Sequence, residues 1–272
     1  AKTPPIHQTR NGEWRLATAE KKRILLNSMF GVDIDSQAVE VTKLSLLLKV
    51  LEGENEESIN TQLKLFHERA LPNLSSNIKC GNSLIGPDFY AQHEMQLLDE
   101  EERLRINVFD WRAAFPRVFS ASDAGFSAII GNPPYVRQET LGAAFKQYAA
   151  THFSTYAGTA DLYVYFIEQG HKLLQKGGLL GFICCNKFMR ASYGRALRQF
   201  LAKNTTIRSI IDFGELPVFK GAATFPALIY TENTACVNQR FLHAAIKRLD
   251  FTSLDEEVAA VTTFVRNSWG NQ

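Results

Sequence analysis

The stretch that decides the fold is FSAIIGNPPY, residues 126–135. Its apolar run from Ala128 to Ile130 predicts a short buried strand, which ends at Gly131. Two prolines follow. Neither has a backbone N–H to donate, and Pro134 keeps Pro133 out of helical geometry. We therefore expect a rigid, extended turn at the carboxyl edge of a sheet, which is where open α/β sheets bind their ligands.

The turn after this strand carries groups that suit a planar ligand with an exocyclic amino group. The side-chain oxygen of Asn132 and the carbonyl of Pro133 can accept two N–H hydrogen bonds, and the ring of Tyr135 can stack on the ligand. Asn-Pro and Pro-Pro are also ordinary loop dipeptides, so a plain surface turn is the alternative. The tetrapeptide should occur by chance in about one chain in a thousand of this length. Its place directly after an apolar strand favours the functional interpretation.

The composition is that of an ordinary globular protein, with 45% hydrophobic and 21% charged residues among 272. This length fits one large α/β domain. The net charge of +2 means that any basic surface for nucleic acid must be local. The four cysteines include no Cys-x-x-Cys pair, so the sequence supports neither a zinc site nor a disulfide framework. We expect reduced cysteines in a cytoplasmic protein with no membrane span.

Strand and helix patterns alternate along the chain from residue 29 to residue 213. The spacing of apolar residues predicts helices at residues 18–28, 36–51, 161–175 and 192–203. It predicts strands at residues 29–34, 78–80, 128–130, 179–185, 207–213 and 227–231. A mixed-charge helix at residues 94–105 and an insertion at residues 136–160, with a helix at residues 141–150, interrupt this order. The alternation predicts an α/β fold with a mostly parallel sheet and helices on both faces.

Polar residues stand at the ends of two predicted strands and at the start of one helix. Asp33 lies at the end of the first predicted strand, where a carboxylate can accept hydrogen bonds from ribose hydroxyls. Helix capping is the alternative for Asp33 and the preferred interpretation of Asp35. Asn82 and Ser83 follow the second strand in a Gly-Asn-Ser turn, which by itself is most often only a turn. Asp161 heads a predicted helix, so it is first of all a candidate cap.

Taken together, these features resemble the N6-adenine DNA methyltransferases, above all the methyltransferase region of single-chain, type IIG-like restriction–modification enzymes. Asn-Pro-Pro-Tyr resembles their motif IV, and the runs Tyr135–Glu139 and Gly158–Tyr163 make the resemblance more specific. It extends from residue 18 to residue 232. The resemblance implies a Rossmann-like sheet with an antiparallel last strand, S-adenosylmethionine as the cofactor, and double-stranded DNA with a flipped adenine as the substrate.

The resemblance also implies roles for the cofactor residues. Asp33 matches motif II, whose acid holds the cofactor ribose, and Ile34 matches the residue that packs on the cofactor adenine. Asn82 and Ser83 match motif III, which contacts the adenine, although many relatives have Asp where this chain has Asn82. Asn can accept a hydrogen bond from the adenine amino group as Asp does. Asp161 matches a helix start that borders the cofactor pocket.

The residues that the resemblance implies for catalysis are Asn132, Pro133, Pro134 and Tyr135. In the relatives a second aromatic ring sandwiches the target base against the tyrosine of motif IV. Phe225 and Tyr230 are both candidates for that ring, and the sequence does not choose between them. Either could instead be a core residue, which is the commoner fate of a single aromatic side chain.

One departure from the family pattern concerns the cofactor. Such enzymes carry a glycine-rich loop, motif I, ahead of the acidic motif II, but Gly12 is the only glycine among residues 1–28. We therefore expect the sequence to begin after motif I, its sheet to lack the first strand, and this stretch alone to bind the cofactor weakly. The expected organisation is a partial catalytic domain at residues 1–235 and an extension at residues 236–272 towards a DNA-recognition region.

Two other functions stay open on the sequence alone. Methyltransferases that modify a glutamine amide in proteins share Asn-Pro-Pro-Tyr, although the insertion after Tyr135 and the stretch Phe213–Phe219 argue against them. A non-catalytic DNA-binding scaffold is the other alternative, which the missing glycine loop supports. The oligomeric state does not follow from the sequence.

Overall fold

The structure is a computed structural model, which describes residues 5–8, 12–53, 72–92, 106–120, 124–136, 142–221, 224–236 and 240–269. The chain divides into two compact units, Ala1–Phe115 and Pro116–Gln272. The helix expected at residues 94–105 and the run Arg137–Glu139 lie outside the described residues. None of the helices in the described part of the chain is long and apolar enough to cross a membrane.

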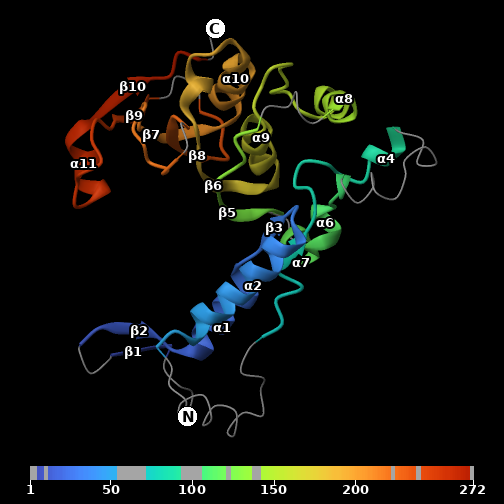
Figure 1. Cartoon of the computed structure of the whole chain (residues 1–272), viewed down its shortest axis with the longest axis vertical. Helices are drawn as coiled ribbons and strands as arrows, with labels where there is room; N and C mark the ends of the chain where they lie inside the picture. The colour runs from blue at the N-terminus through green and yellow to red at the C-terminus, as the bar shows by residue number, and fades with distance from the viewer. Residues whose placement is uncertain are drawn as a thin grey trace, which may run out of the picture. The chain divides into compact units, whose positions relative to one another are not determined.

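The first unit holds a short hairpin and a two-stranded parallel sheet with helices (Figure 1). Its elements are β1 (Ile6–Gln8), β2 (Trp14–Leu16), α1 (Thr18–Ser28), β3 (Gly31–Asp33), α2 (Ser36–Leu51), β4 (Ile78–Cys80), α4 (Phe89–Gln92) and α6 (Trp111–Ala114). Strands β3 and β4 pair in parallel with Asp33 opposite Cys80. Because parallel strands end at the same edge, the residues that follow them are neighbours.

Helix α2 is apolar on two sides. Its inner side, with Val39 and Val50, packs in a core cluster with residues of α1 and β4, among them Leu25 and Ile78. Its other side carries three exposed apolar residues, Val41, Leu44 and Leu48. A helix with apolar residues on two sides is the kind that lies between two layers in a larger core.

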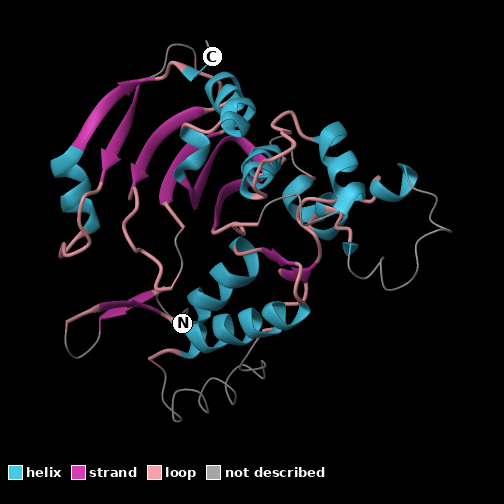
Figure 2. Ribbon diagram, turned by 45° about the horizontal axis from the view of Figure 1, so that its top comes forward, coloured by secondary structure: helices cyan, strands magenta, loops and turns pink. Residues whose placement is uncertain are grey.

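The second unit is built on a six-stranded sheet (Figure 2). Its strands are β5 (Phe126–Gly131), β6 (Leu174–Cys185), β7 (Thr206–Asp212), β8 (Pro226–Glu232), β9 (Arg240–Ala245) and β10 (Thr262–Arg266), in the order β10-β9-β7-β8-β6-β5. Its helices are α7 (Pro116–Phe119), α8 (Gly142–His152), α9 (Tyr163–Leu173), α10 (Arg195–Asn204) and α11 (Leu254–Val261), with 3₁₀ turns η3 (Asn186–Met189) and η4 (Ser192–Gly194).

The strand directions confirm the expected α/β fold. Strand β5 runs parallel to β6, and β7 runs parallel to β9. Strand β8, which the sequence places last in the family region, lies between β6 and β7 and is antiparallel to both. Strand β10 is antiparallel to β9 at the sheet edge. Strands β3 and β5 belong to different sheets of the described chain, so the strand expected between them stays a prediction.

Helices cover both faces of this sheet unequally. Helices α9 and α10 pack on one face, where Gly170 of α9 lies so close that an added Cβ would come within 2.4 Å of a methyl carbon of Leu180. Helix α11 packs on the other face, where Val258 and Val261 join a core cluster with Ile211 and Ala244. Helix α9 contributes several fully buried side chains to this side, among them Tyr163, Tyr165 and Ile167.

The expectation that residues 128–130 form a buried strand is wrong in one respect. The strand exists as β5 and ends at Gly131, but the side chain of Ile130 is 86% exposed. Strand β5 is an edge strand that pairs only with β6 among the described residues, and Leu179 and Tyr230 are exposed beside it on the same face. The apolar run is correct for a strand, but no described part of its own unit covers it.

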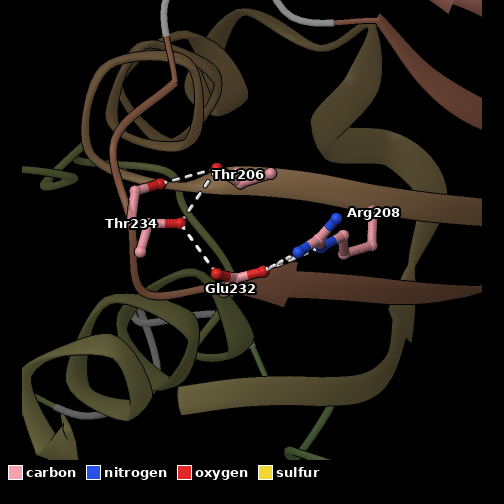
Figure 3. Close-up of polar contacts among 4 residues, drawn as sticks. All are labelled: Thr206, Arg208, Glu232 and Thr234. Carbon is pink, nitrogen blue, oxygen red and sulfur yellow. Dashed lines mark hydrogen bonds and ion pairs between the residues drawn. The ribbon is translucent and has the colours of Figure 1, made fainter. Parts of the chain in front are cut away.

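A polar network fixes the register of the reversed strand β8 (Figure 3). Glu232 accepts hydrogen bonds from Nε of Arg208 at 2.8 Å and from Oγ1 of Thr234 at 3.1 Å. Oγ1 of Thr206 donates to the carbonyl of Thr234 at 2.8 Å, and Thr206 lies directly opposite Glu232. The network lies where β7 begins and β8 ends, which is the edge of the sheet away from the ends of β5 and β6.

Candidate functional site

The first unit brings Asp33 and Asn82 to one edge of its sheet. The carbonyl of Asp33 accepts a hydrogen bond from the backbone N–H of Gly81 at 2.8 Å, directly before Asn82. Oδ1 of Asp33 accepts from the backbone N–H of Asp35 at 2.8 Å, while the side chain is exposed. Ile34, the next residue, is 53% exposed. An exposed carboxylate beside an exposed apolar side chain offers a hydroxyl acceptor and a surface for a flat ring.

Asp35 and Asn82 are held by local hydrogen bonds. Oδ1 of Asp35 accepts from the backbone N–H of Gln37 at 2.8 Å, so the preferred capping interpretation is confirmed. Oδ1 of Asn82 accepts from the backbone N–H of Leu84 at 3.0 Å, and its Nδ2 donates to the carbonyl of Ile106 at 3.1 Å. The Asn82 amide is therefore engaged at both ends, and one lone pair on its oxygen and one N–H of its nitrogen are left for a ligand.

Ser83 lies beside Asn82 and is half-buried. Its carbonyl accepts a hydrogen bond from Nε1 of Trp111 at 3.2 Å. The ring of Phe109 packs so closely under Gly81 that an added Cβ would lie 2.3 Å from a ring carbon. These contacts fix the backbone of the turn after β4.

In the second unit, the Asn-Pro-Pro-Tyr turn leaves the carboxyl end of β5, where Gly131 lies opposite Phe182. Asn132 and Pro134 are exposed, and Pro133 between them is buried. The side-chain amide of Asn132 has no hydrogen-bond partner among the residues that the structure describes. The buried proline anchors the turn, and the amide is presented outward with both its acceptor and its donor available.

The Tyr135 hydroxyl is buried and has no hydrogen-bond partner in the described chain. Burial, together with the nearby thiols of Cys184 and Cys185, raises the pKa of Tyr135 to about 12. The phenol therefore stays protonated at neutral pH and cannot act as a base there. The ring, which is half-buried, is the part of Tyr135 that remains for contact with a ligand.

The start of α9 is tied to this turn. The backbone N–H of Leu162 donates to the carbonyl of Val136 at 2.8 Å. Asp161 accepts a hydrogen bond from the hydroxyl of Tyr193 at 3.4 Å, and that hydroxyl also pairs with the hydroxyl of Tyr163 at 3.0 Å. The capping interpretation of Asp161 is wrong, because the helix has Leu162 as its N-cap residue and no side chain caps it.

The two aromatic candidates lie in different places. Phe225 directly precedes β8 at the edge where β6 ends, since Cys185 lies opposite Pro226. Its ring is half-buried, and Nζ of Lys187 lies 4.7 Å from the ring centroid. Tyr230 lies in the middle of β8 opposite Gly181, on the open face of the sheet. Phe225 thus shares an edge with the Asn132 turn, and Tyr230 does not.

Glu168 is a residue that sequence reasoning missed. Its buried carboxylate accepts hydrogen bonds from the backbone N–H groups of Ser154 at 3.1 Å and Thr155 at 2.8 Å, and it pairs with Nζ of Lys172 at 2.9 Å. Burial raises the pKa of Glu168, but the hydrogen bonds and charge of Lys172 and the Thr155 N–H lower it by more. The pKa of Glu168 is therefore below its usual value. Glu168 fixes the end of the insertion on α9, and only its spacing of four residues from Lys172 could have indicated a role.

Comparisons with known proteins relate the chain to one family. The sequence model of one family, described as Eco57I restriction-modification methylase, matches residues 27–219. The chain is 31% identical over 229 residues to the type II restriction enzyme and methyltransferase RM.Eco57I of Escherichia coli, covering 83% of this chain and 21% of that protein. It is 44% identical over 94 residues to the type II methyltransferase M.BanIII of Aneurinibacillus aneurinilyticus, covering 35% of this chain and 16% of that protein.

Among solved structures, the chain is similar to the ATP-dependent type ISP restriction-modification enzyme LlaBIII bound to DNA. The TM-score is 0.58 at 15% identity, and the match covers 94% of this chain and 18% of that one. A likeness at this identity supports the fold alone. The chain thus spans about a fifth of the length of the E. coli relative and of this structural neighbour.

Proposed function

The chain belongs to the Eco57I restriction-modification methylase family, and from this premise we propose that it transfers a methyl group from S-adenosylmethionine to N6 of adenine in DNA. The observation that carries the proposal is the exposed Asn132 amide, which follows β5 at the carboxyl edge and has no partner in the described chain. With no partner in the described chain, the Asn132 oxygen has both lone pairs available for an amino group.

The acceptors for the target amine are Oδ1 of Asn132 and the carbonyl of Pro133. Both N6–H groups then donate to the protein, which favours a more tetrahedral nitrogen whose lone pair leaves the plane of the ring. The work of these residues is to position the amine and to place dipoles around it, so no strong base is required. Because the Tyr135 phenol stays protonated, its contribution is the ring face, typically worth about 1–3 kcal/mol per stacked base.

The second ring of the base sandwich is proposed to be Phe225. It lies at the edge of the sheet where β6 ends, whereas Tyr230 lies within β8. The adenine would have to be flipped out of the duplex to reach such a site. Double-stranded DNA is therefore the proposed partner, and a cytoplasmic location follows from that substrate.

The residues of the first unit fit the adenosine end of S-adenosylmethionine. Asp33 is an exposed acceptor for ribose hydroxyls, and Ile34 gives an exposed apolar surface for the adenine ring. The turn at Asn82 and Ser83 would border that ring. Asp161 at the start of α9 is proposed as a further cofactor residue on the family resemblance alone. When bound, the cofactor supplies an electrophilic methyl group on a sulfonium. In such a Rossmann-like methyltransferase, a further strand would lie between β3 and β5, and a catalytic domain would end near residue 235.

The test is methylation of DNA by the protein purified at its full length, with labelled S-adenosylmethionine and unmethylated genomic DNA. Asn132→Ala should lower the single-turnover rate by about 10²–10³-fold, as for other preorganised polar groups. Asn204→Ala, at the exposed end of α10, is the matched control and should keep the wild-type rate. Separation of the digested nucleosides should show the label on N6-methyl-2′-deoxyadenosine.

Three outcomes would overturn parts of this proposal. A folded Asn132→Ala variant with the wild-type rate would place the active site elsewhere. Label on N4 of cytosine would correct the base while leaving the site in place. Label on added protein, or none on DNA from the wild-type enzyme, would favour a glutamine-amide methyltransferase or a non-catalytic scaffold.

A further inference from the structure

Phe225 has a strained backbone. Its φ of +46° lies in the left-handed region, where among the described non-glycine residues only Asn107 joins it, with a φ of +47°. Asn tolerates this region because its short side chain bonds locally, but a bulky aromatic residue is a genuine outlier there. Strain of this kind persists only where the surroundings impose it, and it is concentrated at functional sites.

The backbone of Phe225 is bonded to one residue of a neighbouring turn, Asn186. It is the first residue of η3, directly after β6 ends. Its backbone N–H donates to the carbonyl of Phe225 at 2.8 Å, and its side-chain Nδ2 donates to Oδ1 of Asp212 at 2.8 Å. Asp212 ends β7, and the same Oδ1 accepts from the backbone N–H of Gly214 at 2.9 Å. Asn186 therefore joins the end of β7 to the residue that precedes β8.

We propose that Asn186 is a positioning residue, which holds Phe225 in its strained conformation so that the ring is fixed in place to stack on the flipped base. The inference rests on the proposed function. The Asp212 carboxylate orients Asn186 through its side chain, and Asn186 in turn holds the Phe225 carbonyl through its backbone. Lys187, the next residue, has Nζ over one ring face, so the base would use the other face.

The requirement for an amide at residue 186 follows from the acceptor that it meets. Oδ1 of Asp212 already accepts one backbone N–H, so its neighbour must be a donor. Ala at residue 186 keeps the backbone bond to Phe225 but loses the side-chain bond that orients it. Asp at residue 186 would place two carboxylates against each other. Asp212→Asn keeps an oxygen that can accept from both Nδ2 of Asn186 and the Gly214 N–H, whereas Asp212→Ala removes the acceptor that orients Asn186.

The experiment is a double-mutant cycle on the full-length protein, which reads the single-turnover methylation rate at saturating DNA. Asn186→Ala and Phe225→Ala should each lower the rate by about 10–100-fold, the range expected for a misplaced catalytic contact. If Asn186 acts through Phe225, the double variant should be no slower than Phe225→Ala alone. DNA affinity should change little, because phosphate contacts dominate it.

The conservative variant Asp212→Asn supplies the rescue readout. Asp212→Ala should be about as slow as Asn186→Ala, and Asp212→Asn should keep most of the rate, with melting temperatures measured for all variants. Multiplied effects in the Asn186→Ala/Phe225→Ala cycle, a wild-type rate for Asn186→Ala, or a folded Asp212→Asn variant as slow as Asp212→Ala would each overturn the inference. A wild-type enzyme that does not methylate DNA would instead overturn the proposed function.

Discussion

Replacement of Glu168 by glutamine should lower the free energy of unfolding of the second unit by about 2–4 kcal/mol. The Glu168 side chain is only 3% exposed, and its carboxylate serves two backbone N–H groups and one ammonium. Glutamine has the same shape but keeps only one acceptor oxygen. The amide nitrogen of glutamine would face a backbone N–H. Two donors would then meet, and the buried backbone N–H would have no acceptor.

The magnitude follows from these three contacts. A hydrogen bond to a charged group is worth about 1.5–3 kcal/mol, and the variant loses one such bond entirely and weakens the other. The pair with Lys172 adds less, because that side chain is 44% exposed and water replaces its partner, so about 0–1 kcal/mol is assigned to it. Glu168 therefore stabilises mainly through the Ser154 and Thr155 backbone.

Urea unfolding followed by circular dichroism measures this change. Glu40→Gln is the matched control, since Glu40 pairs with Lys43 on α2 but is 72% exposed, and it should cost less than about 0.5 kcal/mol. The pKa of Glu168 is lowered in the folded state, so its stabilisation is present above the usual value of 4.5 and is lost as the pH falls through the folded pKa. The gap between wild type and Glu168→Gln should therefore narrow below pH 4.5. A Glu168→Gln variant as stable as wild type at pH 7 would refute the reasoning.

Three further predictions concern the same unit. A double-mutant cycle on Arg208→Ala and Glu232→Ala should give a coupling energy of about 0.2–1 kcal/mol in urea unfolding. Zero coupling energy would mean that the Arg208–Glu232 pair in Figure 3 does not stabilise β8. Tyr135→Phe removes a buried hydroxyl without a partner in the described chain, so its melting temperature should equal or exceed that of wild type and it should keep most of the methylation rate. Tyr135→Ala should bind the flipped base poorly, because it lacks the ring. A large loss of methylation rate in Tyr135→Phe would mean that the hydroxyl has a partner in the complex with DNA. Burial lowers the pKa of His171 to about 4. The contribution of the neutral imidazole to the free energy of unfolding should therefore be fully present above pH 6.5 and should be lost as the pH falls from 6.5 to 4. His171→Gln should flatten that part of a stability profile, and an unchanged slope would assign it to other groups.

Local patterns predicted most of the elements, but not their order in space. The helix expected at residues 161–175 ends at Leu173, because Leu174 already pairs opposite Phe126 in the sheet. The place of β8 between β6 and β7 could not be read from a chain in which β8 follows β7, since only cross-strand pairing decides it. The apolar run of β5 predicted a strand correctly, but periodicity does not tell which part of a fold will cover it.

Residues that depend on distant partners were the ones that the sequence could not predict. Glu168 and Asn186 act through backbone groups 13 to 39 residues away, and backbone partners leave no residue pattern. The edge positions of Asp33 and Asn82 were predictable because parallel strands end together. The preference for Phe225 over Tyr230 required the strand pairing, because in the sequence both residues lie in or next to the same short strand. Only the pairing shows that Phe225 lies at the sheet edge where β6 ends.

The hydrogen bonds within the chain separate residues that support the site from residues that can meet a ligand. Asn132 presents an amide without a partner in the described chain, and Ile34 presents an uncovered apolar side chain. Asn82, by contrast, has its amide bonded at both ends, to Leu84 and to Ile106, and Asn186 has its amide bonded to Asp212. A buried network holds geometry only if its members stay bonded. The same residue type therefore has two different environments here: Asn132 is the asparagine that would meet the substrate under the proposed function, whereas Asn82 holds the turn after β4 and Asn186 links the end of β7 to Phe225.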